Sequence, residues 1–192
     1  MILRRAGSAD LPGLADLEAA CFDPSARWSA EGWRAELEGE DRACWVVETT
    51  RRGSDDGCQA FAELAAAVCC HVAGDEAELF RVMTAPSARG LGLATMLISA
   101  GLAWAEAAGA TRMLLEVRHD NATARSLYAD LGFTDAYLRT NYYAQGQDAV
   151  VMHRPLGEAP AALTPVEPAG PARDEATPGL WADLHTEEGE RA

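Results

Sequence analysis

Residues 76–118, EAELFRVMTAPSARGLGLATMLISAGLAWAEAAGATRMLLEVR, decide the fold. Glu76–Thr84 and Arg112–Arg118 read as strands, and residues 90–108 between them give the strongest helix signal in the chain, ended by Gly109. A helix that joins two strands of one sheet is a crossover, so at least some of the strand pairing must be parallel. The apolar Arg112–Arg118 strand is expected at the centre of the sheet with both faces covered.

Strand and helix signals alternate through the first 156 residues. Ser8 and Ser29 are suitable helix N-caps, each followed by apolar residues at helical spacing. Gly74 and Asp75 suit a hairpin turn, and Arg51–Gly57 reads as a polar turn. The order is one strand, two helices, three strands, a helix, a strand, a helix and two strands. The other expected elements are the strands Met1–Arg5, Ala43–Thr49, Gln59–Val72, Phe133–Arg139 and Gln147–Arg154 and the helix Asn121–Leu131.

The composition changes near residue 155. Six of the nine Pro lie from Pro155 onward, and residues 157–192 carry a net charge of −6 without apolar periodicity. A segment of this composition cannot bury enough apolar surface to fold. We expect one folded domain, residues 1–156, and a disordered acidic tail, residues 157–192. The apolar patch at residues 180–184 is either an interaction stub or a solvated stretch with one stray Trp.

The net charge of the 192-residue chain is −14, from 30 acidic and 16 basic side chains, and every basic one is Arg. This charge argues against nucleic acid and anionic membranes as partners, because both require a positive surface. A basic polypeptide partner stays open. The N-terminus has no signal-peptide pattern, and no apolar run approaches the ~20 residues that span a bilayer. A reduced, cytoplasmic setting is expected.

Five Cys are present, an odd number without CxxC or Cys/His ligand spacing. This pattern disfavours both a disulfide framework and a zinc site, so we expect no metal and ordinary thiols. Adjacent Cys69 and Cys70 would point to opposite faces of a strand. The other three are Cys21, Cys44 and Cys58.

A glycine-containing loop precedes the strongest helix. Free N–H groups at a helix N-terminus attract anions, and Gly lets a phosphate approach the backbone, although glycines also simply turn chains. The loop is not a Walker A motif, because the Gly-Lys-Ser/Thr ending is absent, and Thr95 breaks a GxGxxG fingerprint. The loop residues are Arg89, Gly90, Leu91, Gly92, Leu93 and Ala94.

Three further segments carry possible chemistry. Glu116 lies in an apolar strand, where it is either neutralised by Arg118 or another Arg, or is a desolvated general base. Tyr128 is either a half-buried helix residue or a proton donor to a departing thiolate, since its ordinary pKa of ~10 keeps it protonated. Tyr142 and Tyr143 read as a loop pair that lines a peptide groove or as a hairpin packed on the core.

These segments in this order resemble the GNAT acetyltransferases, and within them the RimI-type ribosomal-protein-alanine N-acetyltransferases. The resemblance covers roughly residues 1–154, and the LEVR and NYY segments are its most specific parts. The stretches that carry it are ADLPGLADLEAACF (9–22), RWSAEGW (27–33), DEAELFRVMTAP (75–86), RGLGLATML (89–97), LLEVRHDNATARSLYADLGF (114–133) and NYYAQGQDAVVM (141–152). The chain departs from the family pattern in the segment Arg81-Val82-Met83-Thr84, where the family is typically more apolar. It also departs in the turn Pro86–Gly90, which is about two residues short and has Ser87 where Gln or Arg is typical.

The resemblance implies a GNAT fold, with a central twisted mixed sheet of about seven strands flanked by about four helices. It implies acetyl-CoA as donor, the N-terminal amine of a basic small-subunit ribosomal protein as acceptor, and direct attack in a ternary complex. Glu116 then matches the general base and Tyr128 the general acid. The positions that match cofactor contacts are Val82, Met83 and Thr84 in the strand, Ala88 through Leu93 in the loop, and Asn121.

Two alternatives remain at this stage. An acetyltransferase of the same family could act on lysine, on another protein N-terminus or on a small amine. A protein of a different class, a non-catalytic acyl-CoA-binding module, is disfavoured because binding alone requires neither Glu116 nor Tyr128.

Overall fold

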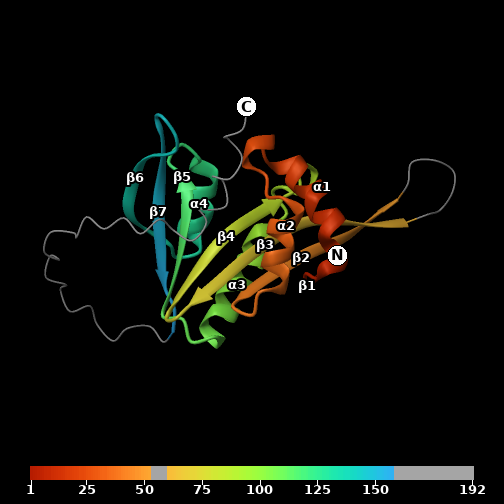
Figure 1. The fold of residues 1–192 in the computed structure, drawn as a ribbon, viewed down its shortest axis with the longest axis horizontal. Coiled ribbons are helices and arrows are strands. Elements are labelled where there is room, and N and C mark those ends of the chain that lie inside the picture. The colour runs from red at the N-terminus through yellow and green to blue at the C-terminus, as the bar shows by residue number, and fades with distance from the viewer. Residues whose placement is uncertain (53–59, 158–192) are drawn as a thin grey trace, which may run out of the picture. The chain divides into compact units, whose positions relative to one another are not determined.

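The computed structural model describes residues 1–52 and 60–157, and these residues form a seven-stranded mixed sheet with the order β1-β2-β3-β4-β5-β7-β6 (Figure 1). Within these ranges β4 and β5 are the one parallel pair, and every other neighbouring pair is antiparallel. The crossover predicted from the sequence is confirmed. The strands are β1 (Ile2–Arg5), β2 (Arg42–Arg52), β3 (Ala60–Ala73), β4 (Glu76–Thr84), β5 (Arg112–Arg118), β6 (Thr134–Ala144) and β7 (Gln147–Pro155).

Four α-helices flank the sheet in the described part of the chain: α1 (Leu11–Cys21), α2 (Ala30–Glu38), α3 (Leu93–Ala107) and α4 (Ala122–Asp130). In Figure 1, α1 and α2 lie over one face and α3 lies over the other. Cys69 and Cys70 mark these two faces. The Cys69 sulfur is 3.6 Å from a carboxylate oxygen of Glu36 in α2, whereas Cys70 lies against Gly101 in α3. The expected order of elements and the opposite directions of the two cysteines are both confirmed.

The two predicted helix caps have different outcomes. Ser29 caps α2, since its Oγ accepts a hydrogen bond from the backbone N–H of Gly32 at 3.1 Å. Ser8 does not cap α1 but belongs to a 3-10 turn, Ser8–Asp10. The Asp10 carboxylate instead accepts from the Gly7 N–H at 2.8 Å, and it also pairs with Arg4. Asp10 is the N-cap residue of α1, and its side chain makes no capping hydrogen bond to that helix.

Two other element boundaries differ from the predicted ones, at places where the backbone is irregular. Helix α3 begins at Leu93 rather than residue 90, because Gly90 and Gly92 have φ angles of 77° and 74°. Such left-handed residues cannot continue a right-handed helix. Strand β6 runs past Arg139 to Ala144.

The central core lies between α3 and the sheet. Leu97, Ile98 and Met113 are fully buried there. Along β5, alternate residues differ in burial, because Leu115 on the α3 side is buried while Glu116 is half-buried. The prediction that both faces of this strand are covered is therefore wrong for the Glu116 face, which is only partly covered.

The prediction of unpaired thiols is wrong for one pair. Cys44 and Cys69 lie directly opposite in the β2–β3 register and form a disulfide. They are 25 residues apart in the chain, so only the strand register brings them together. Cys21 and Cys70 are free. Cys58, residues 53–57 of the expected turn and residues 158–192 of the expected tail lie outside the described residues.

None of the helices within residues 1–52 and 60–157 is long and apolar enough to cross a membrane.

Candidate active site

The two parallel strands separate halfway along their length. β4 and β5 pair only from Glu76–Leu79 and Arg112–Leu115, and they then diverge (Figure 1). The β3–β4 register passes from Cys70 opposite Leu79 to Cys69 opposite Arg81, which leaves Phe80 as an extra residue. A bulge of this kind bends its strand, so β4 turns away from β5 at the point where their pairing stops.

The edge of β4 that faces this opening includes the predicted acetyl-CoA segment. Val82, Met83 and Thr84 pair with β3 on one side, and no described strand pairs with them on the other. Their backbone groups on that edge can bind an extended ligand as a further strand would. The Thr84 carbonyl accepts from the Cys21 thiol and from the Arg89 side chain, each at 3.4 Å.

The glycine loop has the conformation that an anion site requires. Gly92 is the N-cap of α3 in the left-handed conformation, so the first N–H groups of this 15-residue helix point into the loop. A Cβ added at Gly90 or Gly92 would meet no atom within 4 Å. Of the other predicted loop residues, Ala88 and Leu93 are buried, Ala94 is half-buried, and Arg89 and Leu91 are exposed. The cradle is therefore open and fits a phosphate group.

Glu116 lies on β5 beyond the last residue that pairs with β4. Its carboxylate is 2.7 Å from the Arg139 guanidinium, and its side chain is 20% exposed. Burial raises the pKa of Glu116 above its ordinary value, while a hydrogen bond from Tyr142 and the charge of Arg139 lower it. The predicted alternative partner, Arg118, pairs instead with Asp120 at 2.6 Å.

Tyr142 and Tyr143 reach the site through an irregular end of β6. The β6–β7 register jumps from Arg139 opposite Ala149 to Ala144 opposite Gln147, so residues 140–143 face a single β7 residue. The prediction that the two tyrosines lie on a loop is therefore wrong, because this bulged segment is still part of β6. Their rings meet edge to face at 5.0 Å.

Asn141 sets the shape of this bulge. Its φ of 55° is the one positive value among the described residues other than Gly. Its N–H donates to Asp148 at 2.9 Å, and its side-chain oxygen accepts from the Gly146 N–H at 2.7 Å. Asn tolerates the left-handed conformation better than most residues. These bonds fix the turn that carries the tyrosine pair.

Tyr128 is buried in α4, where its ring meets Phe133 edge to face at 6.0 Å. Burial and the nearby Tyr143 raise the pKa of Tyr128 to about 12, so its phenol stays protonated at neutral pH. Within residues 1–52 and 60–157, no group is hydrogen-bonded to its hydroxyl. Partial burial and the charge of Glu116 raise the pKa of Tyr143 to about 12. Tyr143 thus interacts with both Glu116 and Tyr128.

Asn121 is the N-cap of α4. Its side-chain oxygen accepts from the Ala124 N–H at 3.1 Å, and the residue is exposed. The amide NH₂ makes no hydrogen bond within the described residues and can donate to the predicted cofactor.

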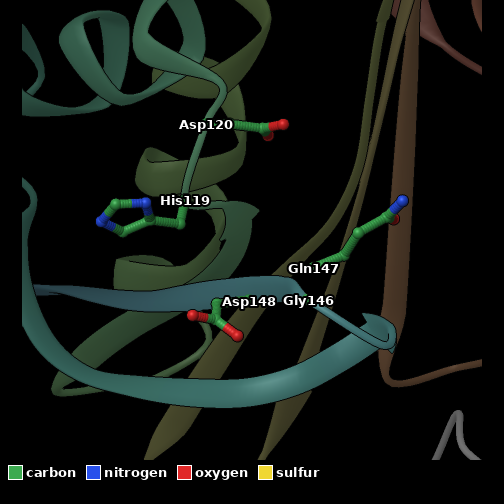
Figure 2. Close-up of a pocket in the computed structure, with 5 residues that line it drawn as sticks. All are labelled: His119, Asp120, Gly146, Gln147 and Asp148. Carbon is green, nitrogen blue, oxygen red and sulfur yellow. The ribbon is translucent and has the colours of Figure 1, made fainter.

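A small pocket of about 80 Å³ was not predicted from the sequence (Figure 2). It is lined by His119, Asp120, Gly146, Gln147 and Asp148. It lies between the end of β5 and the β6–β7 turn, where the His119 N–H donates to the Asp148 carbonyl at 2.9 Å. In Figure 2 the side chains of Asp120 and Gln147 point to one side, and Arg118 donates hydrogen bonds to both. Neither Glu116 nor Tyr128 lines this pocket.

We searched the described residues for side chains that could bind a metal ion. The described residues contain no group of three or more His, Cys, Asp or Glu side chains that could hold a metal ion.

Residues 11–133 match the family model for the acetyltransferase (GNAT) family. The chain belongs to this family. A GNAT enzyme uses acetyl-CoA as the acetyl donor, in agreement with the open strand edge and glycine cradle, so the chain is an acetyltransferase. The predicted family and fold are confirmed.

The chain is similar to individual proteins in sequence and in fold. The [ribosomal protein bS18]-alanine N-acetyltransferase of Salmonella typhimurium is 41% identical over 106 residues, which are 54% of this chain and 68% of the relative. The crystal structure of the ribosomal-protein-S18-alanine N-acetyltransferase from Escherichia coli has a TM-score of 0.67 at 28% identity and covers 85% of this chain and 98% of that one. NAA60 of Arabidopsis thaliana, solved with a bisubstrate analogue, shares the fold with a TM-score of 0.67 at 18% identity, over 81% of this chain and 99% of that one.

Proposed function

We propose that this acetyltransferase moves the acetyl group of acetyl-CoA to the N-terminal amine, on alanine, of the small-subunit ribosomal protein bS18. The observation that carries the proposal is the half-buried carboxylate of Glu116 at the opening between β4 and β5, beside Tyr142 and Tyr143. The 41% identity to a relative with this activity supports the acceptor. A ribosomal acceptor also implies a cytoplasmic setting.

Glu116 is proposed as the general base. An N-terminal amine has an ordinary pKa near ~8, so at neutral pH only one proton must be removed before the nitrogen can attack. Burial raises the pKa of Glu116 and makes it a stronger base, while Arg139 and Tyr142 act in the opposite direction and favour its ionised form.

Tyr128 is proposed as the general acid. When the amine attacks the thioester carbonyl, the carbon–nitrogen bond forms and the carbon–sulfur bond breaks, and the departing thiolate requires a proton. The pKa of about 12 keeps the Tyr128 phenol protonated, and its hydroxyl has no hydrogen-bond partner among the described residues. The phenol can therefore donate to the leaving sulfur.

Acetyl-CoA supplies the activated thioester. The β4 edge at Val82–Thr84 is proposed to bind its extended arm, and a backbone N–H near Thr84 to stabilise the developing oxyanion. The loop from Ala88 to Ala94 is proposed to bind the pyrophosphate through backbone N–H groups, with Asn121 as a further contact. No metal is proposed.

Tyr142 and Tyr143 are proposed to line the acceptor groove. Aromatic side chains bury large areas at low entropic cost, and Tyr143 is 45% exposed and available to a peptide. The net charge of −14 would speed the approach of a basic ribosomal protein.

Mass spectrometry of peptide products tests the acceptor. The assay compares a peptide with the bS18 N-terminal sequence, the same peptide with its N-terminus blocked but a lysine present, and a free small amine. We expect acetylation of the free N-terminus alone. Preference for lysine or the small amine would overturn the proposed acceptor but not the membership of the GNAT family. Acetyl-CoA binding without any transfer would support the binding-module alternative.

A further inference from the structure

Arg81 in β4 makes contacts with both α1 and the chain that follows it. It follows the Phe80 bulge, where β4 turns away from β5. Its guanidinium donates from Nε and Nη2 to the two carboxylate oxygens of Glu18 in α1, at 2.9 and 2.8 Å. The Arg81 side chain is 14% exposed and that of Glu18 is 2% exposed. A buried, two-point pair of this kind fixes the orientation of both side chains.

The same guanidinium holds the connection between α1 and α2, which we call the 22–28 segment after its residue numbers. Nη2 of Arg81 also donates to the Ala26 carbonyl at 2.5 Å. The guanidinium lies 3.9 Å from the ring centre of Phe22 and 4.7 Å from that of Trp28. Cations over aromatic faces are attracted by the ring quadrupole. One side chain of β4 therefore contacts the beginning, middle and end of this segment.

The 22–28 segment lies on the side of the opening where the acceptor is proposed to bind. Arg81 lies on β4 next to the Val82–Thr84 edge, so the segment that it holds lies beside this edge. The thiol of Cys21, just before the segment, donates to the Thr84 carbonyl at 3.4 Å. The segment thus adjoins the β4 side of the opening.

We propose that Arg81 is a positioning residue for the acceptor, which holds the 22–28 segment as the wall of the groove opposite Tyr142 and Tyr143. Glu18 is the buried anchor of this arrangement. The inference rests on the proposed function, because it assumes that an acceptor peptide enters this groove. Arg81 itself makes no contact with the reacting atoms in the proposal, so its loss should weaken acceptor binding and leave the chemical step and acetyl-CoA binding unchanged.

The decisive variant is the Glu18→Gln/Arg81→Met double substitution, since it removes both charges and leaves neither one buried alone. Arg81→Lys keeps the charge but lacks the two-point fork. Arg112→Met is the matched control, because Arg112 pairs with Glu76 on the same two strands at their paired end. Steady-state kinetics give separate KM values for peptide and acetyl-CoA, and hydrogen exchange of the full chain reports on the 22–28 segment.

We expect the double variant to raise the peptide KM about tenfold, with kcat and the acetyl-CoA KM within about twofold of the parent. Arg81→Lys should restore part of the peptide affinity, and Arg112→Met should change none of these constants. Exchange in the 22–28 segment should be faster in the double variant alone. An unchanged peptide KM, or an equal rise in both KM values, would overturn the proposal.

The exchange measurement separates this inference from the proposed function. If the parent protein acetylates no N-terminal peptide, the proposed function fails. Faster exchange of the 22–28 segment in the double variant, but not in Arg112→Met, would still support the positioning role of Arg81. Equal exchange in all proteins would contradict it.

Discussion

The guanidinium of Arg139 lies 2.7 Å from the carboxylate of Glu116, although β7 separates their two strands in the sheet. Glu116 lies opposite Val151, and Arg139 lies opposite Ala149, so the two side chains meet across β7. The positive charge favours the ionised carboxylate and opposes the effect of burial on its pKa. The proposed base is therefore balanced between two opposing influences.

Removing the positive charge should move the acid limb of the pH–rate profile. In Arg139→Met the pKa of Glu116 rises further, because burial remains and the favourable charge is lost. The base is then protonated at a higher pH, so kcat/KM should fall at higher pH than in the parent. A profile of kcat/KM from pH 5 to 9 measures this shift. Arg125→Met removes an exposed partner of Asp135 and should leave the limb in place; a similar shift in both variants would contradict the assignment.

Tyr142→Phe should shift the same limb in the same direction. The Tyr142 hydrogen bond also lowers the pKa of Glu116, so its loss raises that pKa. If both groups act on one carboxylate, this shift should add to the shift in Arg139→Met. A small deviation from additivity is expected, because the Arg139 guanidinium lies 5.5 Å from the ring centre of Tyr142. The same pH profile of the single and double variants measures it, and a limb that does not move in Tyr142→Phe would show that this hydroxyl does not act on the base.

Tyr128→Phe should slow the reaction without weakening the binding of acetyl-CoA. Removing a general acid typically costs about 10²–10⁴-fold in rate. The ring contact with Phe133 survives in the variant, and within the described residues the hydroxyl has no hydrogen bond to lose, so stability should change little. Single-turnover rates with saturating acetyl-CoA measure the loss, and calorimetry measures donor binding. A full-rate variant would remove Tyr128 as the acid.

Gly92→Ala should weaken acetyl-CoA binding. The φ of 74° at Gly92 is costly for Ala by about 1–2 kcal/mol, so the loop would shift away from the conformation that presents its N–H groups. Gly74→Ala is the matched control, since Gly74 has a φ of 63° at the β3–β4 hairpin, at the other end of β4. Both variants should lose similar stability in a thermal melt, but only Gly92→Ala should raise the donor Kd. Equal donor affinity in the two variants would argue against the loop as the phosphate site.

The order of elements could be predicted because each carries its own local signal. The crossover helix, the hairpin at Gly74 and the serine cap at Ser29 depend on neighbouring residues and were all confirmed. The Cys44–Cys69 disulfide depends on strand register across 25 residues, and spacing in the sequence gives no sign of it. The predicted serine cap at Ser8 is wrong because a 3-10 turn at Ser8–Asp10 moves the start of α1 to Leu11.

The site was predictable only in part, for a related reason. Glu116 and Tyr128 were predicted from the type of residue, the pattern around it and the family resemblance, and their catalytic roles stay predictions. Arg139, which is proposed to tune the base, and Arg81, which contacts the 22–28 segment, have partners that are distant in the chain, so the local sequence does not reveal those partners. Their roles follow from the β7 register and from the bulge at Phe80, neither of which has a local signature.

The contact between α3 and β3 gives a test of the core. A methyl group at Gly101 would lie 2.6 Å from the Cys70 sulfur, closer than packed atoms allow. Replacing Gly by Ala in a helix normally raises the free energy of unfolding by up to about 1 kcal/mol, but overpacking lowers it by about 1–3 kcal/mol. Gly101→Ala should therefore lower the free energy of unfolding measured in urea. Gly32→Ala, in α2 with neighbours no closer than 3.6 Å, should not. Adding Cys70→Ala to Gly101→Ala should recover much of the loss, because it removes the clashing sulfur; a double variant as unstable as the sum of both single changes would show that another contact limits the packing there.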